Sequence, residues 1–305
     1  MKDRLKGSVF LLLATVIWGN AFVAQSVGMD YIGPFTFQVI RCALAVVFLA
    51  PVTFLFERRK GGISSSLSRW RDPVLWKAGI LCGCALFVAT SLQQIGLIYT
   101  DAGKSGFLTA MYIVLVPVFG IFIGRKPPKT AVFSVLPAVI GLYFLSFAGM
   151  GGIRTGDLAL VGCAVAFAVQ ILCIDRFAGT VDGLRLNCVQ ALTVTVISVP
   201  FMVFTESVSF SRILDCWLPL GFAGVLSMGV AYTLQIQGQK LLEPTTASLL
   251  MSTESVFALL GGWLLLGETM TQWEILGCVL IFAAVVISQL PSRNLRKTEA
   301  KNGKE

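Results

Sequence analysis

The sequence predicts an all-α membrane protein whose ten transmembrane helices form two inverted five-helix repeats. Of the 305 residues, 56% are apolar and only 13% are charged, at a mean hydropathy of +0.82. A soluble domain has roughly 25% charged residues, so this composition excludes a soluble globular protein, and it is the reverse of a disordered chain. Ten apolar segments are long enough to cross a bilayer, and the two halves of the chain share residues at fixed offsets.

The ten predicted spans are separated by clusters of glycine, proline and charged residues. A helix needs about 20 mostly apolar residues to cross about 30 Å of hydrocarbon, and such clusters mark where one element ends and the next begins. The spans are expected at residues 8–26, 34–56, 75–99, 106–124, 130–149, 157–174, 186–204, 218–238, 245–267 and 273–290.

The positions of the basic residues predict the orientation of these spans. With the N-terminus in the cytoplasm, 20 of the 24 Lys and Arg residues fall on the cytoplasmic side and three on the other side, while Arg41 lies inside the second span. Short cytoplasmic loops carry the excess of basic residues, so both termini are expected in the cytoplasm. The net charge of +8 and the pI of 9.2 therefore reflect topology and do not indicate nucleic-acid binding.

Two stretches of the chain indicate an internal duplication. Residues 11–30 match residues 156–175 at seven of twenty positions, with an offset of 145. At an offset of 142, the third and fourth spans also match the eighth and ninth. Five spans is an odd number, so the two repeats must cross the membrane in opposite directions, as in transporters whose substrate site lies between inverted repeats. The expected organisation is an N-terminal cytoplasmic segment at 1–7, a first repeat at 8–149, a second repeat at 156–290 and a basic cytoplasmic tail at 291–305.

Two charged residues are expected at membrane depth. Arg41 lies seven residues into the second span, and Glu254 lies nine residues into the ninth. Each charge costs about 2.5 to 3.5 kcal/mol on insertion scales, so it should face protein or a water-filled cavity. We predict that both line a central cavity, with Glu254 as a cation or proton site and Arg41 as its partner or as a clamp for a substrate carboxylate. The alternative is a buried ion pair that joins the repeats without touching substrate.

The predicted substrate-binding set also contains two repeat-related glutamine pairs and two aromatic residues. Amide groups can donate to a substrate carboxylate and accept from an amine, or they can bond one helix to another. Aromatic rings can form an apolar or cation-binding wall, to which Phe22, Phe107 and Tyr232 are further candidates. The residues of this set are Gln25 with Gln170, Gln93 with Gln235, and Trp18 and Tyr112.

The composition also excludes several kinds of active site. The chain has no histidine, which excludes the Ser-His-Asp triad, His-ligated zinc and axial-His haem. The Gly-Lys-Ser sequence at Lys104 lacks the upstream glycine spacing and the strand-to-helix setting of a P-loop. We therefore expect a plain helix start or a gate at Lys104 and no nucleotide hydrolysis. The prediction is no cofactor, no metal site and no enzymatic activity.

The order of small and apolar motifs over both halves resembles the drug/metabolite transporter superfamily, specifically its ten-span EamA branch. The likeness covers residues 8 to 290. Many relatives resemble Glu-Pro-Val in the ninth span, where this chain has Glu254-Ser-Val, so no proline kink carries over. The motifs are Trp18-Gly-Asn-Ala-Phe22, Pro34 with Arg41, Tyr99 to Pro117, Gly156-Asp157, Pro244-Thr-Thr-Ala-Ser248, Glu254-Ser-Val-Phe-Ala258 and Leu266-Gly-Glu268.

This resemblance implies a secondary transporter of the plasma membrane, with multiple passes and both termini in the cytoplasm. It implies alternating access and export of small metabolites, such as amino acids or related compounds. The expected partners are a small-molecule substrate and the lipid bilayer, with a proton or another ion as a candidate for coupling, and no nucleic acid. The alternative is a membrane-embedded lipid-handling protein or enzyme, which would need a cluster of catalytic groups at the membrane interface.

Overall fold

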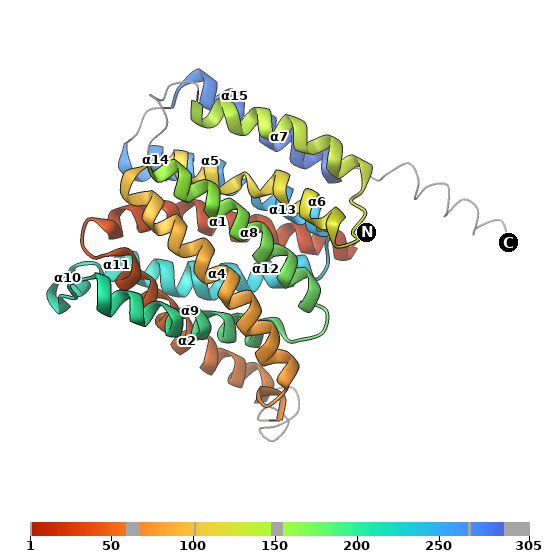
Figure 1. The fold of residues 1–305 in the computed structure, drawn as a ribbon. Helices are drawn as coiled ribbons and strands as arrows, with labels where there is room; N and C mark the ends of the chain where they lie inside the picture. The colour runs from red at the N-terminus through yellow and green to blue at the C-terminus, as the bar shows by residue number, and fades with distance from the viewer. Residues whose placement is uncertain (1, 59–67, 101, 148–154, 268–269, 290–305) are drawn as a thin grey trace.

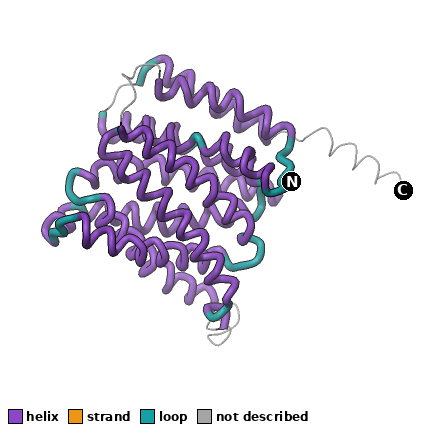
Figure 2. Tube along the Cα trace, in the orientation of Figure 1, coloured by secondary structure: helices purple, strands orange, loops and turns teal. Residues whose placement is uncertain are grey.

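The computed structural model describes residues 2–58, 68–100, 102–147, 155–267 and 270–289. The predicted basic tail at 291–305 lies outside these residues, as do 148–149 of the fifth predicted span. Within the part that the structure describes, every regular element is a helix (Figure 2). The predicted all-α class is therefore confirmed for these residues.

The helices fall into a first half, up to Phe147, and a second half, from Thr155. Those of the first half are α1 (Lys2–Met29), α2 (Pro34–Arg58), α4 (Pro73–Tyr99), α5 (Ala102–Ala110), α6 (Tyr112–Phe122) and α7 (Lys129–Phe147). Those of the second half are α8 (Thr155–Phe177), α9 (Gly183–Thr205), α10 (Phe210–Asp215), α11 (Trp217–Gly221), the π-helix η1 (Phe222–Ala231), α12 (Tyr232–Gln239), α13 (Pro244–Met251), α14 (Glu254–Leu266) and α15 (Gln272–Gln289).

Nine segments of the described chain are long and apolar enough to cross a membrane. Three of these segments combine neighbouring helices: α5 with α6, α11 with η1 and α12, and α13 with α14. Helix α7, in the place of the fifth predicted span, contributes a shorter apolar stretch, Lys129–Phe144.

Local sequence signals explain where several helices begin and end. Asp72 caps α4 by accepting a hydrogen bond from the backbone of Val74 at 2.9 Å. Asp182 caps α9 in the same way, because its carboxylate satisfies a backbone N–H that the first turn of a helix leaves unpaired. Helix α14 ends at Leu266, and the next residue, Gly267, has a φ of +70°, the left-handed conformation that glycine adopts without strain.

The closest helix packing joins the first half of the chain to the second. Helix α7 packs along α15, α2 along α9, and α4 along α8, while α1 packs against α12 and α14. Figure 1 shows α7 and α15 together at one edge of the molecule and α2 and α9 at the opposite edge. The remaining long helices lie between these two pairs, so the two halves interlock around one shared interior.

The surface and the interior have the distribution expected of a membrane protein. Large apolar side chains are exposed around the outside, including Phe122 at 84% and Phe204 at 86% exposure. Polar side chains such as Gln38, Gln94 and Gln190 are buried between the helices. An extensive exposed apolar surface would be unfavourable in water but is suited to contact with lipid.

The second and seventh predicted spans contact the helix that follows them through the same kind of bond. The amide of Gln38 in α2 donates to the hydroxyl of Ser91 in α4 at 3.0 Å. The amide of Asn187 in α9 donates to the hydroxyl of Thr233 in α12 at 2.9 Å. Gln38 and Asn187 are 149 residues apart, as are Pro51 inside α2 and Pro200 inside α9. Ser91 and Thr233 are 142 apart. The two bonds therefore lie at corresponding positions of the two halves.

The eighth predicted span departs from a regular helix. Residues Phe222–Ala231 form the π-helix η1, which sequence reasoning missed. The side-chain amide of Asn187 donates to the backbone oxygens of Met228 at 2.9 Å and of Gly229 at 3.0 Å. A side chain that inserts into the backbone hydrogen-bond ladder is a recognised cause of such irregular turns, and π-turns are frequent at functional sites.

Candidate functional site

A cavity lies between the two halves in the centre of the bundle. Its volume is about 30 Å³, which is room for about two water molecules. Helices α1, α2, α4 and α6 line it from the first half, and α8, η1, α12, α13 and α14 from the second. Its lining residues are Trp18, Phe22, Gln25, Arg41, Gln93, Tyr112, Phe167, Ile171, Ser227, Tyr232, Gln235, Met251 and Glu254.

Seven of the eight residues predicted to bind substrate line this one cavity. The exception is Gln170, which lies just behind it and accepts a hydrogen bond from the amide of Gln235 at 3.3 Å. The geometry therefore brings the predicted set together, and binding of substrate by these residues stays a prediction. Sequence reasoning missed the apolar residues Phe167, Ile171 and Met251, because an apolar residue in an apolar span carries no signal of a site. It also missed Ser227, since a single serine is common in membrane helices.

Arg41 is buried on the side of the cavity formed by α1 and α2. Its guanidinium donates to the amide oxygen of Gln25 in α1 and, at 3.2 Å, to that of Gln38 one turn earlier in α2. The guanidinium also lies 5.8 Å from the ring centroid of Phe37. These contacts fix the head group, while its Nε has no hydrogen-bond partner in the protein.

Glu254 is buried at the start of α14 and accepts a hydrogen bond from the hydroxyl of Tyr112 at 2.9 Å. It forms no ion pair with Arg41. Both the prediction that Arg41 is the partner of Glu254 and the alternative of a buried ion pair between the halves are therefore wrong in this structure. The physical reason is that the amide oxygens of Gln25 and Gln38 already hold the guanidinium. The cavity therefore has a cationic and an acidic group that do not neutralise each other by direct contact.

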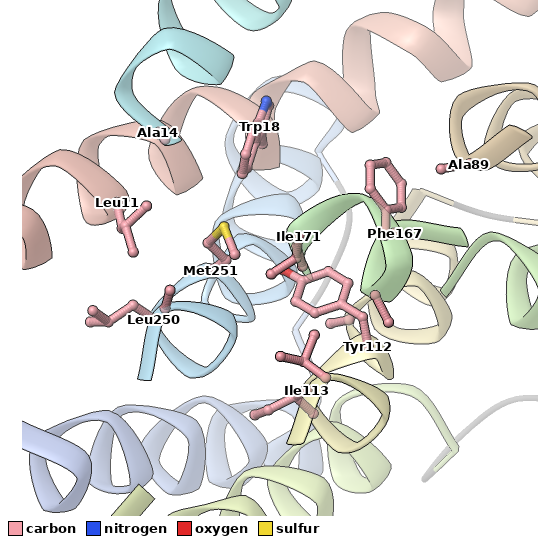
Figure 3. Close-up of a cluster of buried hydrophobic side chains, with 14 of the residues drawn as sticks. Leu11, Ala14, Trp18, Ala89, Tyr112, Ile113, Phe167, Ile171, Leu250 and Met251 are labelled. Carbon is pink, nitrogen blue, oxygen red and sulfur yellow. The ribbon is translucent and has the colours of Figure 1, made fainter. Parts of the chain in front are cut away.

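Aromatic rings form much of the remaining wall, as the close-up in Figure 3 shows for Trp18, Phe167 and Tyr112. The rings of Trp18 and Tyr232 meet edge to face with centroids 4.9 Å apart. The indole Nε1 of Trp18 is buried without a hydrogen-bond partner. Phe107, also a candidate for this wall, is buried in the core and does not line the cavity.

The fourth and ninth predicted spans are each broken into two helices at the level of the cavity. Helix α5 ends at Ala110 and α6 begins at Tyr112, whereas α13 ends at Met251 and α14 begins at Glu254. Tyr112 and Glu254 are 142 residues apart, which is the offset predicted for this part of the repeat. The two residues that bond to each other across the cavity are thus equivalent positions of the two halves.

Both breaks consist of one tighter helical turn. The backbone N–H of Met111 donates to the oxygen of Leu108 at 3.4 Å, and that of Thr253 to the oxygen of Leu250 at 3.2 Å. These bonds reach back three residues, whereas an α-helix bonds across four. Short stretches of this kind often mark a functional hinge.

Hydroxyl side chains bond to the preceding turn at the second break, in a segment without proline. Ser252 donates to the backbone oxygen of Leu249 at 2.8 Å, and Thr253 donates to that of Leu250 at 2.8 Å. Thr253 also bonds the hydroxyl of Thr15 in α1 at 3.0 Å. Serine and threonine bonds to the preceding turn often bend helices, so these hydroxyl groups favour a bend here without a proline.

A buried ion pair lies at one end of the bundle, away from the cavity. Lys104 near the start of α5 donates to Asp157 near the start of α8 at 2.7 Å, and the two side chains are 2% and 9% exposed. Thr100 donates to the same carboxylate at 3.2 Å. Lys104 therefore does more than begin a helix, because it ties the first half to the second.

Comparison with known proteins places the chain among transporters. The model of the EamA-like transporter family matches it twice, at residues 5–147 and 154–289. An uncharacterised transporter of Archaeoglobus fulgidus is 31% identical, covering 94% of this chain and 87% of that protein. The threonine/homoserine exporter RhtA of Escherichia coli K12 is 28% identical, covering 95% and 93%.

A solved crystal structure shares the fold, with a TM-score of 0.76 and 19% identity over 95% of this chain and 98% of the other. The two family matches fall on the two halves that meet at the central cavity. Together with its apolar helices, they identify a multi-pass membrane protein. The chain belongs to the EamA-like transporter family of the drug/metabolite transporter superfamily.

Proposed function

We propose that the protein is a secondary transporter that exports small metabolites, such as amino acids or related compounds, from the cytoplasm by alternating access. The observation that carries this proposal is the presence of one basic and one acidic side chain in the same central cavity, with Arg41 from the first half and Glu254 from the second. An amino acid has a carboxylate that suits the guanidinium fork of Arg41. Its ammonium group suits Glu254 and the aromatic wall around it.

Unpaired polar atoms at the cavity support a role in binding. The indole N–H of Trp18, the Nε of Arg41 and the amide oxygen of Gln235 are buried without a protein partner. Such groups are costly when left unsatisfied, and all three belong to residues that line the cavity. In the proposal, substrate or water completes their hydrogen bonds.

Transport through this cavity requires movement of its walls. A volume of about 30 Å³ is too small for an amino acid, since it accommodates about two waters. The breaks between α5 and α6 and between α13 and α14 are the proposed hinges. Opening the end held by Lys104 and Asp157 would separate α5 from α8 and give the substrate access from that side.

The proposed architecture is ten spans in two inverted five-helix repeats, one at 8–149 and one at 156–290, with both termini cytoplasmic. Three equivalences between the halves support it: the two breaks, the Gln38 and Asn187 bonds, and the double family match. Because inverted repeats are alike in structure, the contacts that close one side of the membrane can give way to equivalent contacts that close the other side. A proton bound at Glu254 is the candidate for coupling.

The printed names of relatives support the choice of substrate class. RhtA exports threonine and homoserine by its name, and it aligns over 95% of this chain. Both compounds carry the paired carboxylate and ammonium groups that the charges of the cavity would recognise. We therefore expect amino acids ahead of polyamines or quaternary amines, which lack a carboxylate.

Counterflow in proteoliposomes tests this proposal. A panel of labelled amino acids, polyamines and quaternary amines is compared for the wild type, Glu254→Gln and the control Glu274→Gln, which lies at the start of α15 outside the cavity. We expect the wild type to exchange amino acids, and we expect this exchange to be lost in Glu254→Gln and kept in Glu274→Gln. A second run with a pH gradient tests proton coupling. Equal exchange by both variants, or lipid scrambling without exchange of any solute, would contradict the proposal.

A further inference from the structure

A large apolar groove lies on the outside of the bundle between α4, α6 and α8. Its volume is about 850 Å³, far greater than that of the central cavity. Its floor is apolar and includes Leu81, Phe122 and Val169, which are 45%, 84% and 43% exposed. In a membrane protein, such a surface faces the acyl chains of lipids.

One end of this groove carries charge. Arg125 follows the end of α6, and Arg176 lies in the last turn of α8, so both are at helix ends, where a spanning helix meets the lipid headgroups. Arg125 forms an ion pair with Asp175, and its side chain remains 46% exposed. Two arginines and one aspartate leave a net positive charge at this end.

The bundle contains a second groove, at repeat-related positions, that lacks this charge. It lies between α1, α11, η1 and α14 and has a volume of about 450 Å³. Ala24 and Leu265 line it at the positions equivalent to Val169 and Ile123, with offsets of 145 and 142. Its lining residues, all within the part of the chain that the structure describes, include no Asp, Glu, Lys or Arg.

We propose that the groove between α4, α6 and α8 binds a phospholipid with an anionic headgroup. An acyl chain lies along the apolar floor, and the headgroup phosphate meets Arg125 and Arg176, because guanidinium groups match phosphate geometry. Basic pockets between membrane helices select anionic lipids for this reason. The uncharged equivalent groove accepts acyl chains without this selection.

The shape of the groove argues against a second copy of the chain as its occupant. Symmetric dimers use the same patch on both subunits. In such a dimer the grooves of the two copies would face each other, and no protruding side chains would fill them. The proposal requires only the membrane location of the protein, and it stands or falls separately from the transported substrate.

Native mass spectrometry of the full chain in detergent tests the charged end. Phosphatidylglycerol and phosphatidylcholine with identical acyl chains are titrated onto the wild type and Arg176→Gln. The control is Lys129→Gln, which changes a basic residue at the start of α7 outside the groove. We expect preferential binding of phosphatidylglycerol that falls about fivefold in Arg176→Gln, since an arginine near the membrane surface contributes about 1 kcal/mol. Lys129→Gln should bind like the wild type.

A second pair of variants tests the apolar floor. Val169→Trp fills the charged groove and should remove the tightly bound phosphatidylglycerol, whereas Ala24→Trp fills the equivalent groove and should leave it in place. Equal affinity of the wild type for both lipids, or an equal loss in Lys129→Gln, would overturn the proposal. So would a dimer that Val169→Trp dissociates while phosphatidylglycerol stays bound.

Discussion

The two halves of this transporter share a scaffold but differ in the residues that they present to the cavity. In the first half, Arg41 donates to the amide oxygen of Gln38 three residues earlier at 3.2 Å. At the equivalent positions of the second half, Gln190 donates to Asn187 at 2.8 Å. Arg41 lines the cavity and Gln190 does not.

The helix breaks differ between the halves in the same way. Tyr112 and Glu254 begin the second segment of each broken helix, and only the second half has a carboxylate there. Each half therefore contributes one charge of its own, at a position where the other half has an uncharged side chain. The comparison teaches that duplication supplies the framework and that the chemistry lies where the halves differ.

The largest expected effect comes from the ion pair between Lys104 and Asp157, which has no counterpart at the repeat-related positions. The positions equivalent to Lys104 and Asp157 are Thr246 and Leu12, at offsets of 142 and 145. Asp157→Asn removes the carboxylate that accepts from buried Lys104 at 2.7 Å, so the free energy of unfolding should fall by about 3 to 5 kcal/mol. Denaturant unfolding in detergent measures this loss.

The matched control is Asp175→Asn, because the partner Arg125 is 46% exposed. An ion pair at the surface contributes about 0 to 1 kcal/mol, so this variant should unfold close to the wild type. Similar destabilisation by the two variants would show that burial does not distinguish the two ion pairs.

A smaller effect is expected from the hydrogen bond between Tyr112 and Glu254, which occupy equivalent positions of the two halves. Tyr112→Phe removes the hydroxyl that donates to Glu254 at 2.9 Å and keeps the ring. Counterflow should slow about fivefold to tenfold, since a hydrogen bond of this kind contributes about 1 kcal/mol or slightly more. Tyr232→Phe, which preserves the edge-to-face contact with Trp18, is the control. Unchanged exchange by Tyr112→Phe would show that this bond has no role in transport.

The smallest effect is expected at the hydroxyl groups of the second break. Thr253→Val removes the bonds to Leu250 and Thr15 but keeps the side-chain volume. The first break, at Met111, forms without a hydroxyl side chain, so the second should persist and unfolding should become easier by only about 0.5 to 1 kcal/mol. Thermal unfolding and counterflow measure the two outcomes, and complete loss of exchange by folded protein would place the hydroxyl in the transport mechanism.

Sequence reasoning predicted the membrane helices and most of the cavity because both depend on simple patterns. Apolar runs predict spans, and a charge inside a span must face an interior, which correctly located Arg41 and Glu254. The offset of 142 also predicted that Gln93 and Gln235 would be equivalent, and both line the cavity.

The irregular helices could not be predicted in this way. The side chain of Asn187 in another helix bonds the backbone of the π-helix at residues 222–231, and hydropathy does not report such tertiary contacts. The partner of Arg41 was also mistaken, because side chains of nearby turns, here Gln25 and Gln38, compete with a distant carboxylate. That Arg41 and Glu254 lie inside the bundle was predictable, whereas their choice of partner was not.

The central claim is that Arg41 and Glu254 recognise opposite ends of one substrate, and paired counterflow tests it most directly. An amino acid that the wild type exchanges is compared with the amine that remains when its carboxylate is removed, in the wild type and in Arg41→Gln. Arg41→Gln introduces the residue that the second half has at the equivalent position, Gln190. The account predicts that the wild type prefers the amino acid by about tenfold or more and that Arg41→Gln loses this preference. An unchanged preference in folded Arg41→Gln protein would contradict it.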